Sequence, residues 1–280
     1  MRGDFSQAAA SYDAAAVLAA EVGRRMAERL DYVKIAPQRV ADIGCATGDG
    51  IRELARRYPK ALPLAIDFAL PMLRQVALRN SLMQNLFSRF VGKSPRLLNA
   101  DVNALPLQNG SLGLAWSNLM LHWLADPLPA FRELQRSLEV GGLVTFSLLG
   151  PDTLKEIRTA CTACGIDPPM VPLRRFHDMH DIGDMLVAAG FADPVMDMEM
   201  ITLTYASPRG LLRDQRHLGV RDALFGELPW RDWRRVLSAW QTAHAADALP
   251  ATFEIVYGHA WKPAPRAISD GRAVINFVKP

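Results

Sequence analysis

Three carboxylates lie at the ends of short apolar runs in the first part of the chain. Asp42, Asp67 and Asp101 each belong to a segment with the composition of a buried strand, or directly follow one. A carboxylate accepts hydrogen bonds from hydroxyl and amino groups. Asp67 can therefore take the two hydroxyls of a ribose, and Asp101 can take the amino group of an adenine. The spacing predicts neighbouring strand ends with a nucleoside held between them.

A glycine-containing turn surrounds the first of these carboxylates. Residues 40–48 read VADIGCATG, which predicts a buried strand, a tight turn and a helix beginning near Ile51. Glycine lets the backbone approach a ligand closely, and the amides at the N-terminus of the helix point into the same space. We expect a nucleotide-like cofactor over this turn. Its contacts there are expected to be Asp42, Gly44, Cys45, Ala46 and Gly48.

The spacing of the small residues in this turn separates two classes of cofactor. A dinucleotide site has glycines in the pattern G-x-G-x-x-G, with an acid about 20 positions further on. Here small residues alternate at 44, 46 and 48, an acid precedes them, and an acid ends each of the next two strands. The series resembles the class I S-adenosylmethionine (SAM)-dependent methyltransferases, so we expect SAM rather than NAD(P) or a purely structural turn. Ala46 departs from that family, which usually has glycine, and should fit if its φ angle stays negative.

Composition and charge limit the remaining possibilities. The chain has 280 residues, of which 50% are hydrophobic, and 3 cysteines. Its net charge of +3 is too small to predict nucleic-acid binding. The cysteines follow no secreted pattern, no apolar run reaches the roughly 18 residues of a membrane span, and the N-terminus has no targeting pattern. We expect a globular cytoplasmic protein that binds neither nucleic acid nor membrane.

Helices and strands are predicted to alternate over the first 150 residues. Leu18, Val22, Met26 and Leu30 recur every four residues, as on one face of a helix. A helix near 131–138 is expected to be closed by the glycine pair at 141 and 142. This alternation predicts an α/β fold with a doubly wound, Rossmann-like sheet of seven strands, and it places ligands beyond the carboxyl ends of the strands.

The pattern changes after Gly150. Two further helices, over 151–164 and 178–189, precede two predicted strands, over 195–205 and 253–261, and helices rich in arginine and tryptophan lie between these strands. In this fold such an insertion commonly carries a substrate cap. Within a single domain we expect lid helices over 1–36, the SAM-binding core over 37–150, the rest of the core over 151–205, a helical cap insertion over 206–250, and final strands over 251–280 with one at 273–278.

Several longer stretches resemble one methyltransferase family over nearly the whole chain. The more specific ones lie in the second half, at 148–154 (LLGPDTL), 178–186 (DMHDIGDML) and 257–261 (YGHAW). The first half adds SNLMLHW at 117–123 and the paired DFS and YD before residue 14. Together they resemble the malonyl-[acyl-carrier protein] O-methyltransferases of biotin synthesis. The resemblance implies methyl transfer from SAM to the free carboxylate of malonyl-acyl carrier protein, giving the methyl ester that primes pimeloyl synthesis.

The implied reaction needs positioning more than it needs an acid or a base. The sulfonium of SAM is an activated donor and a carboxylate is ionised at pH 7, so the enzyme must mainly hold the reacting atoms in line. Strong ion pairing would lower the nucleophilicity of the carboxylate, so we expect one arginine rather than a cage. No catalytic residue is required. Residues expected to position the reactants or to contact SAM are Tyr12, which resembles a lid tyrosine, and Phe68, Val102, Asn118, Leu119, His122 and Trp123.

Each of these roles has a structural alternative. Tyr12 and Trp123 can serve as packing residues, and Asp101 can cap a helix. Cys161 and Cys164 form a C-x-x-C, but on a predicted helix with no second pair to complete a metal site. The histidines and aspartates at 177–181 are better explained by a helix that begins at His177 or Asp178, so no metal is expected.

Arginines in the predicted cap indicate where an acidic carrier protein would bind. Acyl carrier proteins are acidic as a family, and the segment 206–250 contains seven arginines. Arg209, Arg213 and Arg216 are spaced to share one helix face. Arg174 and Arg175 are further candidates, either for the carrier or for the malonyl carboxylate. An ordinary solvated helix face is the alternative.

Other functional classes remain open from the sequence. A protein hydroxylase or assembly factor can be built on a methyltransferase fold, although the expected transit peptide and oxidant site are missing. A small-molecule SAM-dependent methyltransferase would act on a free quinone precursor or fatty acid. A non-catalytic SAM-binding module would bind SAM without turnover.

Overall fold

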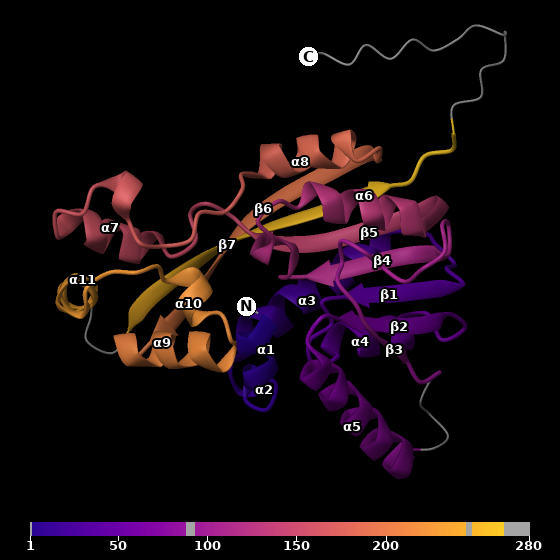
Figure 1. Ribbon diagram of the computed structural model, residues 1–280, viewed down its shortest axis with the longest axis horizontal. Helices are drawn as coiled ribbons and strands as arrows, with labels where there is room; N and C mark the ends of the chain where they lie inside the picture. Colours follow the sequence, from indigo (N-terminus) through magenta and orange to yellow (C-terminus); the bar gives the residue numbers. More distant parts are fainter. Residues whose placement is uncertain (1, 88–92, 245–247, 266–280) are drawn as a thin grey trace, which may run out of the picture.

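The computed structural model describes residues 2–87, 93–244 and 248–265, and within these ranges the strands form one seven-stranded sheet (Figure 1). The order is β3-β2-β1-β4-β5-β7-β6. The strands are β1 (Arg39–Ile43), β2 (Leu62–Asp67), β3 (Arg96–Asn99), β4 (Leu112–Asn118), β5 (Leu138–Leu149), β6 (Ala192–Tyr205) and β7 (Leu249–Trp261). The predicted doubly wound fold is confirmed, whereas the strand predicted at 273–278 lies outside the described residues.

The direction of the strands brings distant residues to one edge of the sheet. The first five strands pair in parallel, and β7 pairs antiparallel with both β5 and β6. The carboxyl ends of β1, β2, β3 and β4 therefore meet along a single edge. Asp67 ends β2 and Asn118 ends β4, so both side chains lie at this edge, where an open α/β sheet binds its ligands.

Helices cover both faces of the sheet because neighbouring strand residues point to opposite sides. On one face, Val40 and Trp116 pack with the helices α3 (Val17–Arg29), α4 (Asp49–Arg57) and α5 (Leu70–Phe87). On the other, Ala41 and Phe146 pack with α6 (Leu128–Ser137) and α8 (Met179–Ala188). Strands buried on both faces read as continuous apolar runs, which explains the composition of 62–66 and, apart from Asp42, that of 40–43.

The start of α8 and the end of α6 can be compared with the predicted helix boundaries. Asp178 begins α8 as predicted: its carboxylate accepts the His180 amide at 2.7 Å, and Asp181 completes a capping box. The end predicted for α6 is wrong, because α6 ends at Ser137 and the glycine pair lies inside β5. Those glycines pair instead with Lys262, whose carbonyl accepts the Gly141 amide at 2.9 Å.

A group of helices lies beyond the far end of the β6–β7 pair. These two strands pair from Ala192 with Trp261 to Tyr205 with Leu249, and between them run α9 (Pro208–His217), α10 (Arg221–Leu224) and α11 (Trp230–Thr242). We call α9, α10 and α11 the cap, which lies at the left of Figure 1. Helix α7 (Lys155–Ala163) packs against α11, and the fully buried Trp240 belongs to their shared core.

The N-terminal helices connect the sheet edge to the cap. Helix α1 (Arg2–Ala8) packs on α5, and α2 (Tyr12–Ala15) packs on α9. The Ser11 hydroxyl donates to the carbonyl of His217 at 3.2 Å, and the Thr47 hydroxyl donates to the carboxylate of Asp13 at 2.6 Å. The segment before α3 therefore touches both the glycine turn and the cap.

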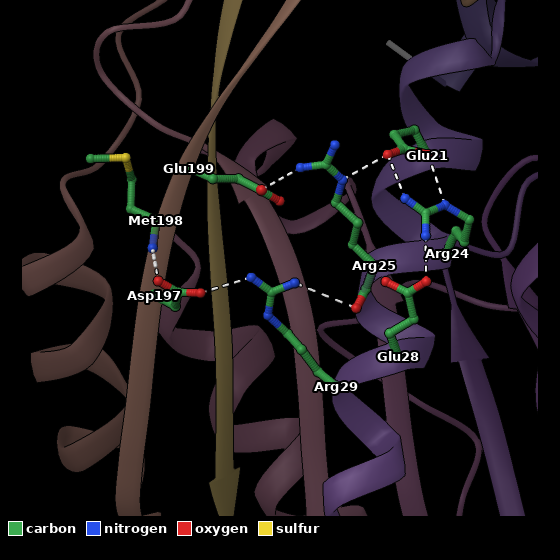
Figure 2. Close-up of polar contacts among 8 residues, drawn as sticks. All are labelled: Glu21, Arg24, Arg25, Glu28, Arg29, Asp197, Met198 and Glu199. Atoms are coloured by element: carbon green, nitrogen blue, oxygen red, sulfur yellow. Dashed lines mark hydrogen bonds and ion pairs between the residues drawn. The ribbon is translucent and has the colours of Figure 1, made fainter.

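Helix α3 is also tied to the edge strand of the sheet by charge (Figure 2). Arg25 pairs with Glu199, and Arg29 pairs with Asp197 at 2.7 Å. The Arg29 guanidinium also lies 3.7 Å from the centroid of the Tyr257 ring on β7. These contacts join α3 to β6 across the width of β7, but their side chains remain partly exposed, so packing beneath α3 should contribute more to stability.

Replacing the buried Met26 should therefore destabilise the chain more than breaking the ion pair next to it. Met26 is 1% exposed, and Met26→Ala should lower the free energy of unfolding by about 2–5 kcal/mol. Arg25→Ala should lower it by less than about 1 kcal/mol, and by less still in high salt. Urea denaturation at two salt concentrations measures both effects. An equal loss in the two variants would show that charge, rather than packing, holds α3.

Candidate active site

A cavity of about 330 Å³ lies where the sheet edge, the N-terminal helices and the cap meet. The sheet contributes the glycine turn and the residues that end β2, β3 and β4. The predicted site residues that line it are Tyr12, Gly44, Ala46, Asp67, Phe68, Asp101, Val102, Asn118, Leu119, His122 and Trp123. Asp42, Cys45 and Gly48 are absent from this lining among the described residues.

Asp67 links two backbone segments at the cavity wall. One carboxylate oxygen accepts the Ala46 amide at 3.0 Å, and the other accepts the Ala69 amide at 2.8 Å. Burial raises the pKa of Asp67, and these amide bonds oppose that shift. The backbone amides do not use all the lone pairs of the carboxylate, so it can still accept hydroxyls from the cavity. This acceptor fits the hydroxyl groups of a ribose.

The backbone of the glycine turn differs from the prediction at Ala46. Its φ angle is +44°, so the condition under which alanine is expected to fit, a negative φ, is not met. Left-handed backbone disfavours a residue with a Cβ by about 1–2 kcal/mol, and the hydrogen bond to Asp67 holds Ala46 in that conformation. Gly44 is more strictly required, because a Cβ there would lie 2.3 Å from the Cγ of Met120.

Asp42 lies beneath the turn rather than in the cavity. Its side chain is 2% exposed and accepts a backbone hydrogen bond from Ile51, near the start of α4. Burial is the largest cause that raises the pKa of Asp42 to about 8, and nearby carboxylates add to it. Gly48 precedes α4 with a φ of +93°. Both residues therefore support the turn that forms the cavity wall.

Asp101 forms a local turn at the cavity edge. One of its oxygens accepts the backbone amide of Asn103 at 2.9 Å and the side-chain amide at 3.0 Å. This is an Asx turn and not the start of a helix, so the helix-cap alternative does not apply. Its carboxylate is exposed, and the next residue, Val102, is buried against the sheet. Both line the cavity.

Asn118 and Leu119 join three elements at the end of β4. The Asn118 amide donates to the carbonyl of Ala19 in α3 at 2.8 Å, and its oxygen accepts the Ser147 hydroxyl of β5 at 2.8 Å. Leu119 has a φ of +49° and donates its amide to the same hydroxyl oxygen at 3.0 Å. The end of β4 therefore positions α3 over the cavity.

His122 is a neutral hydrogen-bond donor. It is 6% exposed, and its Nδ1 accepts the Leu149 amide at 3.3 Å, which leaves the proton on Nε2. Burial, reinforced by Arg174, lowers its pKa well below the ordinary histidine value. Nε2 has no hydrogen-bond partner among the described residues. With one nitrogen occupied and the other protonated, His122 cannot act as a general base.

The predicted arginines lie outside the cavity lining. Arg174 donates to the carbonyls of Trp123 and Leu124, both at 3.2 Å, and lies 5.6 Å from the centroid of the Trp123 ring. Arg175 is exposed and donates to the carbonyl of Pro168 at 3.4 Å. Arginines on the exposed surface of α9 are Arg209, Arg213 and Arg216.

The cap contributes cavity residues that the sequence analysis missed. Tyr205 and Gln215 line the cavity, together with apolar residues of the cap and of β6. Gln215 is 5% exposed although it lies between two exposed arginines. Its position four residues after the buried Leu211 is the one available signal, because both fall on the inward face of α9.

Comparisons with known proteins agree with this arrangement. A family described as a methyltransferase domain matches residues 41–146. The malonyl-[acyl-carrier protein] O-methyltransferase of Gallionella capsiferriformans is 49% identical to the chain, covering 99% of the chain and 94% of that relative. The protein of the same name from Laribacter hongkongensis is 45% identical with the same coverage. The chain belongs to the malonyl-[acyl-carrier protein] O-methyltransferase family.

Solved structures of lower identity share the fold of this family member. YcgJ of Bacillus subtilis is 14% identical, with a TM-score of 0.61 over 88% of the chain and 99% of that structure. Phosphoethanolamine N-methyltransferase 2 of Haemonchus contortus, solved with S-adenosyl-L-methionine, is 18% identical, with a TM-score of 0.52 over 86% of the chain and 52% of that structure.

Within 2–87, 93–244 and 248–265, no group of three or more histidine, cysteine, aspartate or glutamate side chains is placed to hold a metal ion. Within the same ranges, no helix has both the length and the apolar character needed to cross a bilayer.

Burial of Asp42 should make stability fall as pH rises. Between about pH 4 and pH 8 the folded chain keeps a proton on Asp42 that the unfolded chain has lost, so the free energy of unfolding decreases over that range. Asp42→Asn removes this dependence, and its advantage over the wild type should grow by roughly 1.4 kcal/mol for each pH unit. Urea denaturation without ligand at pH 5 and pH 8 measures the change.

A matched variant separates burial from the loss of a charge. Asp184→Asn removes one carboxylate from the exposed surface of α8 without touching the buried group. An Asp42→Asn variant with the same advantage at both pH values would contradict the assignment of a protonated Asp42.

Proposed function

We propose that the chain transfers a methyl group from SAM to the free carboxylate of malonyl-acyl carrier protein. The family to which the chain belongs carries this activity in its name, and the chain matches those relatives along almost their whole length. The observation that carries the proposal is the cavity, which joins a nucleoside-type wall at the sheet edge to an apolar wall at the cap. The methyl ester formed would enter pimeloyl synthesis for biotin.

The sheet-edge wall is assigned to SAM. Asp67 offers free lone pairs to the ribose, and Asp101 and Val102 lie where the adenine is expected. Gly44 allows the turn to form, because any side chain there would collide with Met120. Tyr12 lines the same region from α2 and is assigned as the lid residue. SAM supplies a methyl group already activated on a positively charged sulfur.

The protein's own part in the reaction is positioning and the exclusion of water. The new bond joins a carboxylate oxygen to the methyl carbon, the carbon–sulfur bond breaks, and its electron pair stays on sulfur. No proton moves, so a cavity without a general base is sufficient. The neutral state of His122 and the engaged side chain of Asn118 agree with this. Alignment of the reactants can contribute about 7–11 kcal/mol.

The outer surface of the cap is assigned to the carrier protein. Arg209, Arg213 and Arg216 are exposed on α9, whose opposite side lines the cavity through Gln215. An acidic carrier bound there would need to pass its acyl group only around α9 to reach the cavity. Complementary charge of this kind mainly raises the association rate and depends on salt. A cytoplasmic location, where acyl carrier proteins meet their enzymes, is part of the proposal.

Methyl transfer from labelled SAM tests this function directly. We expect label on malonyl-acyl carrier protein at a higher rate than on malonyl-CoA or free malonate, and we expect mild base to release it, because a carboxyl ester hydrolyses readily. Acetyl-acyl carrier protein, which has no free carboxylate, is the control. Transfer to none of the malonyl compounds, with SAM binding intact, would overturn the proposal in favour of a small-molecule acceptor or a protein-modifying role.

Removing the exposed arginines of α9 should weaken recognition of the carrier without affecting SAM. In the triple variant R209A/R213A/R216A, kcat/KM for malonyl-acyl carrier protein should fall roughly tenfold or more at low salt, since each charge contact contributes a fraction of a kcal/mol to about 1 kcal/mol. The difference from wild type should shrink as salt increases. A triple variant with unchanged kcat/KM at low salt would show that the carrier binds elsewhere.

A further inference from the structure

The cavity contains no obvious partner for a negatively charged substrate. Among the described residues, its lining includes two aspartates, Asp67 and Asp101, but no arginine or lysine. The nearest candidate, Arg174, lies behind the wall with its guanidinium on two backbone carbonyls. The arginine expected to hold the malonyl carboxylate is therefore absent from the lining, and the carboxylate needs another set of donors.

Gln215 has the properties of such a donor. It lies on the inward face of α9, is 5% exposed and lines the cavity. No hydrogen bond joins its side-chain amide to another residue in the described part of the chain. Its backbone carbonyl accepts the backbone amide of Val220 at 2.9 Å. A buried amide without a partner is unfavourable unless a ligand or water satisfies it.

His122 provides a second donor from a different element. It belongs to the short turn after β4, whereas Gln215 belongs to the cap. Its Nδ1 is occupied by the Leu149 amide, and its Nε2–H has no partner in the described ranges. That atom is itself buried from solvent, so it can donate to a ligand only after the wall around it shifts. Two neutral side chains with unused N–H groups, Gln215 and His122, therefore line one cavity.

We propose that the carboxylate to be methylated is held by neutral hydrogen-bond donors, Gln215 first and His122 with it, and not by an arginine. This inference rests on the proposed function and names the residues that select its substrate class, an acyl thioester with a free terminal carboxylate. The amide of Gln215 binds the oxygen that does not react, and the other oxygen keeps its lone pair for the methyl group.

Neutral donors suit this chemistry better than a cation does. A full positive charge would stabilise the carboxylate more than the transition state, because the oxygen loses its negative charge as the ester forms. Interactions stronger in the ground state than in the transition state slow the chemical step. A neutral N–H orients the carboxylate with a smaller change in interaction energy, and it leaves the uncharged ester product free to dissociate.

The test compares two carriers that differ only in the carboxylate. The dissociation constants of malonyl- and acetyl-acyl carrier protein are measured with the intact chain in the presence of a SAM analogue. In parallel, kcat/KM is measured for methyl transfer. In Gln215→Leu we expect malonyl binding and kcat/KM to fall roughly 10- to 100-fold, as for a lost hydrogen bond to a charged group. Acetyl binding should not change, so the preference for the malonyl carrier disappears.

Variants on the same helix and behind the wall serve as controls. Arg213→Leu, two residues away on the exposed surface, should weaken both carriers equally and keep the preference. Arg174→Gln should also keep it. His122→Asn removes the Nε2 donor and should lower kcat/KM, whereas His122→Gln places an amide donor near the same position and should restore part of it. Melting temperature and SAM affinity verify that each variant is folded.

The possible results separate the two proposals. A wild-type protein that methylates no malonyl carrier overturns the proposed function. A wild-type protein that does so, with Gln215→Leu retaining both its kcat/KM and its preference for the malonyl carrier, overturns this inference alone. Loss of the preference in Arg174→Gln but not in Gln215→Leu would assign the carboxylate to the arginine instead.

Discussion

The carboxylate of Asp67 holds together the two strand ends on which the cavity is built. By accepting the Ala46 amide it joins the end of β2 to the turn after β1, and by accepting the Ala69 amide it fixes the start of α5. The glycine turn after β1 covers Asp42, and Asp42 supports the first residues of α4. A single buried acid thus determines the shape of the wall assigned to SAM, and the left-handed backbone of Ala46 follows from the same hydrogen bond.

Charge is distributed in a way that matches the successive parts of the proposed reaction. The sheet-edge wall contains the two aspartates, the cap side of the cavity is apolar with neutral donors, and the arginines of α9 face solvent. A negatively charged acyl group is attracted by the arginines at the surface of α9, and this attraction weakens once the group has entered the cavity. Since the reaction removes that negative charge, the absence of a cation from the lining among the described residues avoids stabilising the reactant.

Local sequence predicted the parts of the structure that depend on neighbouring residues. The strand before the glycine turn, the alternation of strands and helices, and the helix that begins at Asp178 all follow from short-range patterns. The end of α6 did not, because the glycines at 141 and 142 pair with Lys262, more than a hundred positions away in the chain. The φ angle of Ala46 depends on Asp67, and the inward position of Gln215 matters only because α9 folds back over the sheet edge. Each of these required a partner that no local window contains.

The β6–β7 pair also determines how the cap is attached to the sheet. Because Tyr205 at the end of β6 pairs with Leu249 at the start of β7, the chain leaves and re-enters the sheet at one place. Helices inserted there can change in length or sequence without shifting the register of any strand that ends at the wall assigned to SAM. Cavity residues that the cap supplies can thus diverge among descendants of one ancestral enzyme as a single contiguous block of sequence, while those at the sheet edge, His122 included, are inherited with the strands.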